Sequence, residues 1–131
     1  MPYGRITRVI FDPSKYDAMM AVAKSIDFSG WPGLRVLRVV RVAEDTVIVT
    51  ASYEDKSAAD ANMENAKASL GKMAEFMTEE PFVREGEVVW GVDGDQSLTP
   101  GYVRHVFVYL DPAKYDVVIS FFHTTTERSR G

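Results

Sequence analysis

Cysteine is absent from this chain of 131 residues, which excludes disulfide bonds, thiol catalysis and thiolate metal ligands. The two histidines, His105 and His123, do not stand in a cluster with the spacing of a metal site. A structural role is the preferred interpretation of His105, although an isolated histidine can also act as a general base. The sequence also has no glycine-rich phosphate-binding loop, so we expect no metal, flavin or other cofactor.

Long apolar runs and an excess of positive charge are missing as well. No apolar run approaches the roughly 18 residues of a membrane span, and the N-terminus lacks a signal-peptide core. The net charge is -4, so the chain has no basic footprint for nucleic acid. We therefore expect neither a membrane nor a nucleic-acid partner, and we expect the protein in the reducing cytoplasm.

The chain is rich in β-branched residues between Leu34 and Tyr53, where two such runs flank Ala43-Glu44-Asp45. This pattern predicts a hairpin with a three-residue connection that pairs Val42 with Thr46. A two-residue connection would instead shift the register by one residue. Side chains alternate across a strand, so one face is purely apolar and requires a packed helix: Leu37, Val39, Val47, Val49 and Ala51. The opposite face is half polar, with Val36, Arg38, Val40, Ile48, Thr50 and Ser52.

Two helices and two further strands surround this hairpin. Residues 5–11 read as a strand, and Asp12-Pro13 predicts a helix start with a stripe of Tyr16, Met19, Met20, Ala23 and Ile26. A second helix, capped by Asp55 or Ser57, carries a stripe at helical spacing: Ala59, Met63, Ala66, Leu70, Met73 and Met77. Residues 82–90 read as the last strand.

The order strand, helix, hairpin, helix, strand predicts an α+β fold of the ferredoxin-like βαββαβ type. Helices cover one face of such a sheet and leave the other bare. Here the bare face carries Val36, Val40 and Ile48, and an exposed apolar patch usually marks an interface. We therefore expect a homodimer that packs through the face of Arg38, Val40 and Ile48.

The C-terminal part of the chain repeats its beginning. Residues 104–116, RHVFVYLDPAKYD, match residues 5–17, RITRVIFDPSKYD. We expect a domain over residues 1–92, a linker over 93–101 and an extra strand-helix unit over 102–131, as the start of a second copy without the rest. Its strand is predicted at His105–Leu110 and its helix from Asp111 to about His123, with a stripe of Tyr115, Val118, Ile119 and Phe122. An unpaired strand with an apolar helix must dock elsewhere, and we favour the sheet of a partner subunit.

With this order of elements, the chain resembles the dimeric α+β barrel superfamily, in particular the antibiotic biosynthesis monooxygenase-like proteins. The resemblance rests on the element order over residues 5–90, on Tyr53-Glu54-Asp55-Lys56-Ser57-Ala58-Ala59 at the start of an alanine-rich helix, and on Gly86-Glu87-Val88-Val89-Trp90. It implies a homodimer whose sheets form a barrel, with a small hydrophobic pocket between sheet and helices. Some members oxidise aromatic polyketides with oxygen and no prosthetic group. Others degrade haem, but their Asn, Trp and His set has no convincing match here, and the C-terminal extension departs from the family pattern.

The candidate site residues are side chains of the pocket or the sheet face. Arg8 and Arg38, with Thr50 beside them, could form an anion or enolate site on the bare face. The alternative is ion pairing across strands, with Arg8 bound to Glu85 or Glu87. Trp31 and Trp90 could form an aromatic wall for a flat ligand or serve in packing. Met63, Met73 and Met77 could line a pocket, but their helical spacing favours a role in the core.

Two functions are consistent with these patterns. The first is a small-molecule-binding protein that resembles cofactor-independent monooxygenases and acts on aromatic or polyketide-like substrates. The second is a non-catalytic binding or oligomerisation module of the same fold. Both predict a homodimer, and only turnover separates them.

Overall fold

The computed structural model describes residues 1–91, 94, 101–117 and 120. The chain divides into two units, Met1–Val88 and Val89–Gly131. None of the helices in the described part of the chain combines the length and apolar character that crossing a membrane requires.

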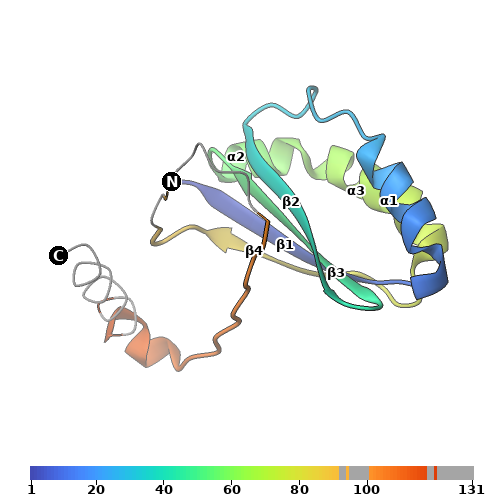
Figure 1. The fold of residues 1–131 in the computed structure, drawn as a ribbon. Helices are drawn as coiled ribbons and strands as arrows, with labels where there is room; N and C mark the ends of the chain where they lie inside the picture. Colours follow the sequence, from blue (N-terminus) through green and yellow to red (C-terminus); the bar gives the residue numbers. More distant parts are fainter. Residues whose placement is uncertain (92–93, 95–100, 118–119, 121–131) are drawn as a thin grey trace. The chain divides into compact units, whose positions relative to one another are not determined.

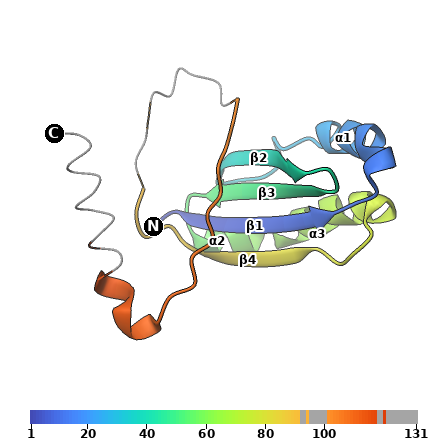
Figure 2. The same ribbon diagram turned by 60° about the horizontal axis from the view of Figure 1, so that its bottom comes forward.

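The first unit is a four-stranded antiparallel sheet with helices on one of its faces (Figure 1). The strands lie in the order β2-β3-β1-β4, with bounds β1 (Tyr3–Ile10), β2 (Leu34–Ala43), β3 (Thr46–Tyr53) and β4 (Phe82–Glu87). The helices are α1 (Tyr16–Lys24), α2 (Lys56–Ala61) and α3 (Met63–Met73), with 3-10 turns η1 (Pro13–Lys15) and η2 (Ala74–Phe76). Figure 2 shows the helices gathered on a single side of the sheet. The predicted βαββαβ order is confirmed.

The hairpin between β2 and β3 closes more tightly than its sequence predicts. Glu44 and Asp45 form a two-residue turn, and Ala43 pairs with Thr46, so the predicted pair of Val42 with Thr46 is wrong. The register shifts between Arg41 and Ala43, and this irregularity takes up the extra residue. The remaining predicted pairs are therefore confirmed, namely Val40 with Ile48, Arg38 with Thr50 and Val36 with Ser52.

Both predicted helix starts are confirmed. The Asp12 carboxylate accepts a hydrogen bond from the Ser14 backbone N–H at 3.0 Å, and Pro13 occupies the first turn. For the second helix, Asp55 rather than Ser57 is the cap, because its carboxylate accepts from the Ala58 N–H at 2.8 Å.

The second helix is interrupted at Asn62, whereas its apolar stripe predicts one continuous helix. The Asn62 side chain is fully buried and donates to the carbonyls of Pro32 (2.7 Å) and Ala58 (2.9 Å). A side-chain amide that bonds to nearby backbone competes with the helical pattern, and here it marks the junction of α2 and α3.

The core lies between the sheet and the helices as two clusters of buried side chains. One contains Val9, Phe11, Met19, Val47 and Phe76, and the other contains Tyr3, Ala51, Tyr53 and Ala59. The predicted stripe residues Tyr16, Met20, Leu70, Met73 and Met77 pack against the first cluster. The apolar sheet face predicted for the hairpin is thus the helix-covered face.

The second unit has little regular structure in the residues that are described. Residues 101–111 form no strand, so the strand predicted at His105–Leu110 is not formed in the single chain. The helix start is confirmed: Asp111 accepts from the Ala113 N–H at 3.0 Å ahead of η3 (Pro112–Lys114). Most of the linker, the stripe residues Val118, Ile119 and Phe122, and His123 lie outside the described residues.

Candidate functional site

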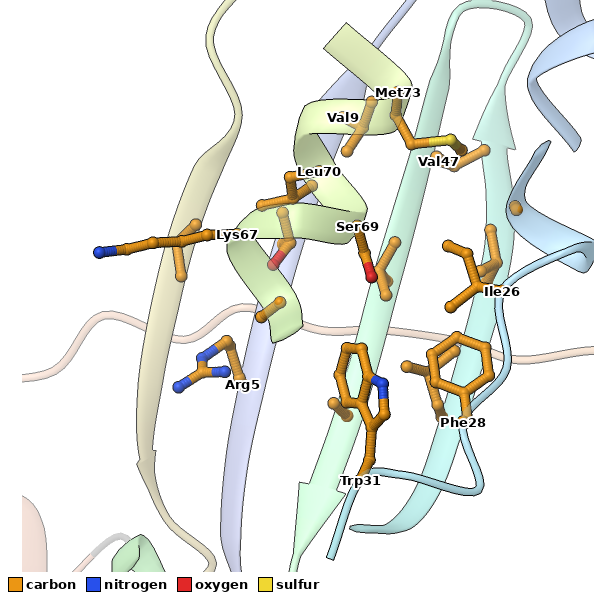
Figure 3. Close-up of a pocket in the computed structure, with 18 of the residues that line it drawn as sticks. Arg5, Val9, Ile26, Phe28, Trp31, Val47, Lys67, Ser69, Leu70 and Met73 are labelled. Carbon is orange, nitrogen blue, oxygen red and sulfur yellow. The ribbon is translucent and has the colours of Figure 1, made fainter. Parts of the chain in front are cut away.

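A pocket of about 570 Å³ lies between the helices and the sheet, and Figure 3 shows the residues around it. The sheet supplies Val9 and Val47, the helix α3 supplies Leu70 and Met73, and the segment after α1 supplies Ile26. Further lining side chains are Met19, Met20, Ala23, Leu37, Val39, Val49, Ala51, Met63 and Ala66. The pocket exists because the predicted apolar sheet face and the helix stripes do not fill all the space between them.

An aromatic pair from the segment between α1 and β2 closes one side of the pocket. The rings of Phe28 and Trp31 lie edge to face, with centroids 5.0 Å apart and planes at 63°. Both residues line the pocket. Such rings offer broad apolar contact to a flat ligand at little conformational cost.

This aromatic segment is held in place at its C-terminal end. The Asn62 amide binds the Pro32 carbonyl, and the Glu54 N–H donates to the Gly33 carbonyl at 2.9 Å. Gly33 has a φ of +78°, and a Cβ at this position would stand 2.5 Å from the Ala58 Cβ. The segment therefore packs so closely against α2 that only glycine fits at position 33.

Arg5 provides a buried positive charge in the pocket wall. It is 6% exposed, and its Nε donates to the Glu85 carboxylate at 2.8 Å. Its Nη atoms make longer bonds to the Tyr53 hydroxyl (3.5 Å) and to the Ala59 carbonyl (3.3 Å). A guanidinium has five N–H donors, so two of them have no hydrogen-bond acceptor among the described residues.

The tyrosines beside Arg5 remain neutral at ordinary pH. Burial raises the pKa of Tyr53 above its usual value of 10.0, although the Arg5 charge acts in the opposite direction. Burial, followed by the Glu85 carboxylate, raises the pKa of Tyr3, whose hydroxyl lies 3.3 Å from Glu85. The pocket wall therefore combines the Arg5 cation with the neutral hydroxyl group of Tyr53, while Tyr3 is not part of the lining.

The charged side chains that line the pocket all have one sign. Arg5, Lys24 and Lys67 are cations, and the described lining contains no carboxylate and no imidazole. Glu85 binds Arg5 but is not part of the lining. The described residues also contain no group of three or more His, Cys, Asp or Glu side chains placed to hold a metal ion. The site therefore favours a mostly apolar ligand that carries negative charge on an oxygen.

The sequence-predicted Trp31 lies in the pocket wall, and so do Met63 and Met73, whereas Met77 packs against the core. Glu87 is exposed and lies opposite Tyr3 in the register of β1 and β4. Trp90 belongs to the second unit. The use of these residues by a ligand remains a prediction.

Arg8, Arg38 and Thr50 lie on the bare sheet face, away from the pocket, because they alternate with lining residues such as Thr7 and Leu37. The ion pair predicted for Arg8 is wrong. Glu85 binds Arg5, on the opposite face, and the Arg8 guanidinium stacks 4.9 Å from the centre of the Phe82 ring.

Arg5 is the site residue that the sequence interpretation missed. A signal for it existed. Arg5 stands two and four residues before Thr7 and Val9, so it occupies the helix-facing side of its strand. A charged residue in phase with core positions is seldom buried without a specific partner.

The fold has counterparts among solved structures. SnoaB, a cofactor-independent oxygenase from Streptomyces nogalater, superimposes with a TM-score of 0.55 at 12% identity, over 71% of this chain and 98% of SnoaB. A provisionally assigned antibiotic biosynthesis monooxygenase from Caulobacter crescentus gives 0.56 at 18% identity, over 68% of this chain and 91% of the other. This chain has the fold of the antibiotic biosynthesis monooxygenase-like proteins.

The monooxygenase-like fold also occurs in NE2512, a protein of unknown function from Nitrosomonas europaea. Its TM-score is 0.61 at 14% identity, over 71% of this chain and 94% of NE2512. No protein-family model and no curated protein matches the sequence, so the likeness lies in the fold alone. These three structures leave more than a quarter of this chain unmatched.

Proposed function

We propose that this protein binds a small, flat, mostly apolar molecule with one acidic oxygen, and that it oxidises such a molecule with O2 and without a prosthetic group. The observation that carries the proposal is the buried Arg5 in the wall of a mostly apolar pocket. The fold shared with SnoaB, which is a cofactor-independent oxygenase, supports the second part of the proposal. The substrates would be aromatic or polyketide-like compounds.

Arg5 would act on the ionised form of the substrate. Its two free N–H donors would bind the oxygen of an enolate or phenolate, and a fixed positive charge in an apolar pocket stabilises such an anion strongly. The lining offers no carboxylate or imidazole as a base. Proton loss would therefore depend on the acidity of the substrate itself, which the charge of Arg5 increases.

The overall reaction would convert a methylene between two aromatic rings into a ketone. The carbanion form of the substrate transfers electrons to O2, and one oxygen atom enters the product while the other leaves as water. The balance is one CH2 group and one O2 molecule giving one C=O group and one H2O. Phe28 and Trp31 would hold the ring system while the oxygen of the substrate faces Arg5.

The binding step can be tested with a pair of ligands that differ in charge, anthracene-9-carboxylate and anthracene-9-carboxamide. In a Trp90→Phe background, the fluorescence of Trp31 reports pocket occupancy. We expect the carboxylate to bind more tightly than the amide. The substitution Arg5→Met should weaken the binding of the carboxylate by about ten- to a hundredfold, as for loss of a charged hydrogen bond. The amide should bind almost unchanged. Glu85 has a side chain 30% exposed, so it can remain hydrated after Arg5 is removed.

Arg8→Met is the matched control, because Arg8 lies on the same strand but on the bare face. It should leave the binding of both ligands unchanged. Equal loss of carboxylate binding in both variants would refute a specific role for Arg5. If neither ligand changes the Trp31 fluorescence of the parent protein, the proposed pocket function is wrong.

The alternative function is a binding or oligomerisation module without catalysis. It is favoured because the described residues that line the pocket include no carboxylate or imidazole that could act as a base. Oxygen consumption with anthrone separates the two functions. We expect consumption of one O2 per anthrone and a rate that falls in Arg5→Met. Binding without oxygen consumption would favour the non-catalytic module.

A further inference from the structure

Among the described strands, β4 presents an open edge. It lies at the end of the sheet order and pairs with β1 on one side. Its side chains alternate between the helix-covered face, with Val83, Glu85 and Glu87, and the bare face, with Phe82 and Arg84. Glu85 is already bound to Arg5, whereas Glu87 is exposed. An open edge with unpaired backbone groups is a template for an added strand.

The segment 102–110 has the composition of a strand, but it forms none in the described residues. Its large side chains are strongly exposed in the single chain, with Val106 at 74%, Phe107 at 52%, Val108 at 59% and Tyr109 at 90%. In a strand, alternate residues face opposite sides, so both sides of this segment would be apolar. Such a strand is typical of a sheet that is covered on both faces.

The segment also matches β1 in local geometry at its end. Asp111 has φ and ψ of -68° and 120°, and Asp12 has -71° and 113°. Each aspartate accepts a hydrogen bond of 3.0 Å from the N–H two residues later. The sequence repeat is therefore a repeat of the strand-to-helix corner. Because β1 pairs with β4, a second strand of the same type suits the other edge of β4.

We propose that residues 102–110 of one copy add an antiparallel strand to the free edge of β4 in a second copy of the chain. The side chains select the register with Arg104 opposite Glu87, since Glu85 already has a cationic partner. In this register Val108 lies opposite Val83, and Tyr109 lies opposite Phe82. The same register places Val106 opposite Glu85 and Phe107 opposite Arg84, so it matches one charged, one aliphatic and one aromatic pair across the new ladder.

The length of the connection favours a second copy rather than the same chain as the occupant. Docking on its own β4 would need residues 88–103 as a hairpin connection, whereas such connections usually have about two to five residues. Mutual exchange between two copies closes with two-fold symmetry and leaves no segment unpaired. This assembly is independent of the pocket function.

A disulfide trap tests both the register and the source of the strand, because the chain has no cysteine of its own. The full-length variant with Val83→Cys and Val108→Cys should form a covalent dimer on mild oxidation, seen by mass spectrometry without reductant. Mixing the single variants Val83→Cys and Val108→Cys should give a heterodimer that is joined by one disulfide bond. The matched control combines Val83→Cys with Tyr109→Cys, whose side chain would face the other side of the sheet, and should not cross-link. A disulfide within one chain, or no disulfide at all, would overturn the proposal.

Charge reversal gives a second test in solution. Arg104→Glu and Glu87→Arg should each weaken the dimer about tenfold, because an exchange with two-fold symmetry contains the contact twice. The double variant should recover the affinity of the parent chain. Lys72→Glu, an exposed reversal on α3, is the control and should have no effect. Sedimentation analysis measures these affinities, and a monomeric parent chain or a double variant without recovery would contradict the exchange.

Discussion

At the scale of single residues, the first strand shows how side-chain alternation divides like charges between two environments. Arg5 is buried on the helix-covered face and is bound to Glu85, whereas Arg8 is exposed on the bare face and stacks on Phe82. The two residues are three positions apart, so the period of two places them on opposite sides. A buried cation needs partners, and Arg5 has them in three different elements: β4, β3 and α2.

Gly33→Ala should destabilise the protein by about 2 kcal/mol, since it adds both a strained backbone and an overpacked contact. The φ of +78° disfavours any side chain, and the new Cβ would stand 2.5 Å from the Ala58 Cβ. Urea unfolding measures the loss. Gly30→Ala is the control, because a Cβ at Gly30 meets nothing within 4 Å, and its stability should match that of the parent chain. Equal effects of the two substitutions would contradict this account.

The buried Tyr53 should make the fold sensitive to alkali. Because its pKa is raised above 10.0 in the folded state, the folded protein holds the phenol proton more tightly than the unfolded chain does. The resulting stability is present below pH 10 and is lost as the pH rises through the folded pKa. The free energy of unfolding should fall less between pH 9 and pH 11 in Tyr53→Phe than in the parent chain. Tyr102→Phe, at an exposed position, should keep the full pH dependence.

At the scale of elements, the junction between α2 and α3 positions the aromatic side of the pocket. Asn62 ends α2 and binds the carbonyl of Pro32, which directly follows Trp31. The Asn65 amide in turn donates to the Asn62 side-chain oxygen at 3.0 Å. The helix break thus has a structural function, because it links α3 and the segment that carries Phe28 and Trp31.

Asp55→Ala should lower the free energy of unfolding by about 1 kcal/mol, since it removes the side chain that caps α2. The bond lost is the 2.8 Å contact from the Ala58 N–H. Asp55→Asn should keep most of the stability because an amide oxygen can accept the same hydrogen bond. Ser57→Ala should be almost neutral, and a larger effect at Ser57 than at Asp55 would identify Ser57 as the cap. Thermal and urea unfolding of the three variants provide the comparison.

At the scale of the whole molecule, the sheet face without helices has a distinct character. Val36 is 37% exposed and Val42 is 51% exposed, while Ile48 is buried between its cross-strand neighbours Arg8 and Val40. Arg8, Arg38 and Arg84 are exposed on this face, and the described strands place no carboxylate among them. Dimerisation through this face, which the sequence predicts, remains a proposal and is compatible with exchange of residues 102–110.

Val40→Lys tests the sheet-face dimer. The substitution places a further positive charge next to Ile48 and on the same face as Arg8, so burial against a second copy would leave it without a partner. We expect the dimer dissociation constant to rise about tenfold or more, measured by light scattering after gel filtration. Ala21→Lys, on an exposed position of α1, is the control. An unchanged dimer in Val40→Lys would exclude this face as the interface.

Local chemistry alone determined several features of this protein. The order of strands and helices follows from the spacing of apolar residues, which has a period of two in strands and of 3.6 in helices. This spacing is present in the sequence and does not depend on long-range contacts. The caps at Asp12, Asp55 and Asp111 are likewise local, because each carboxylate binds an N–H two or three residues away. The identity of the covered sheet face was also predictable, since only one face of the hairpin is purely apolar.

Only the tertiary structure decided the rest, because it depends on contacts between residues distant in the chain. Arg5 became a pocket residue through Glu85, which is 80 positions away. The break at Asn62 depends on the carbonyl of Pro32, 30 positions away, and the helix stripe contains no sign of it. The pocket itself is a gap left by the packing of helices on the sheet, so no local pattern specifies its size or its charge. Sequence periodicity determined which side chains face inward, and three-dimensional packing determined which of those leave space for a ligand.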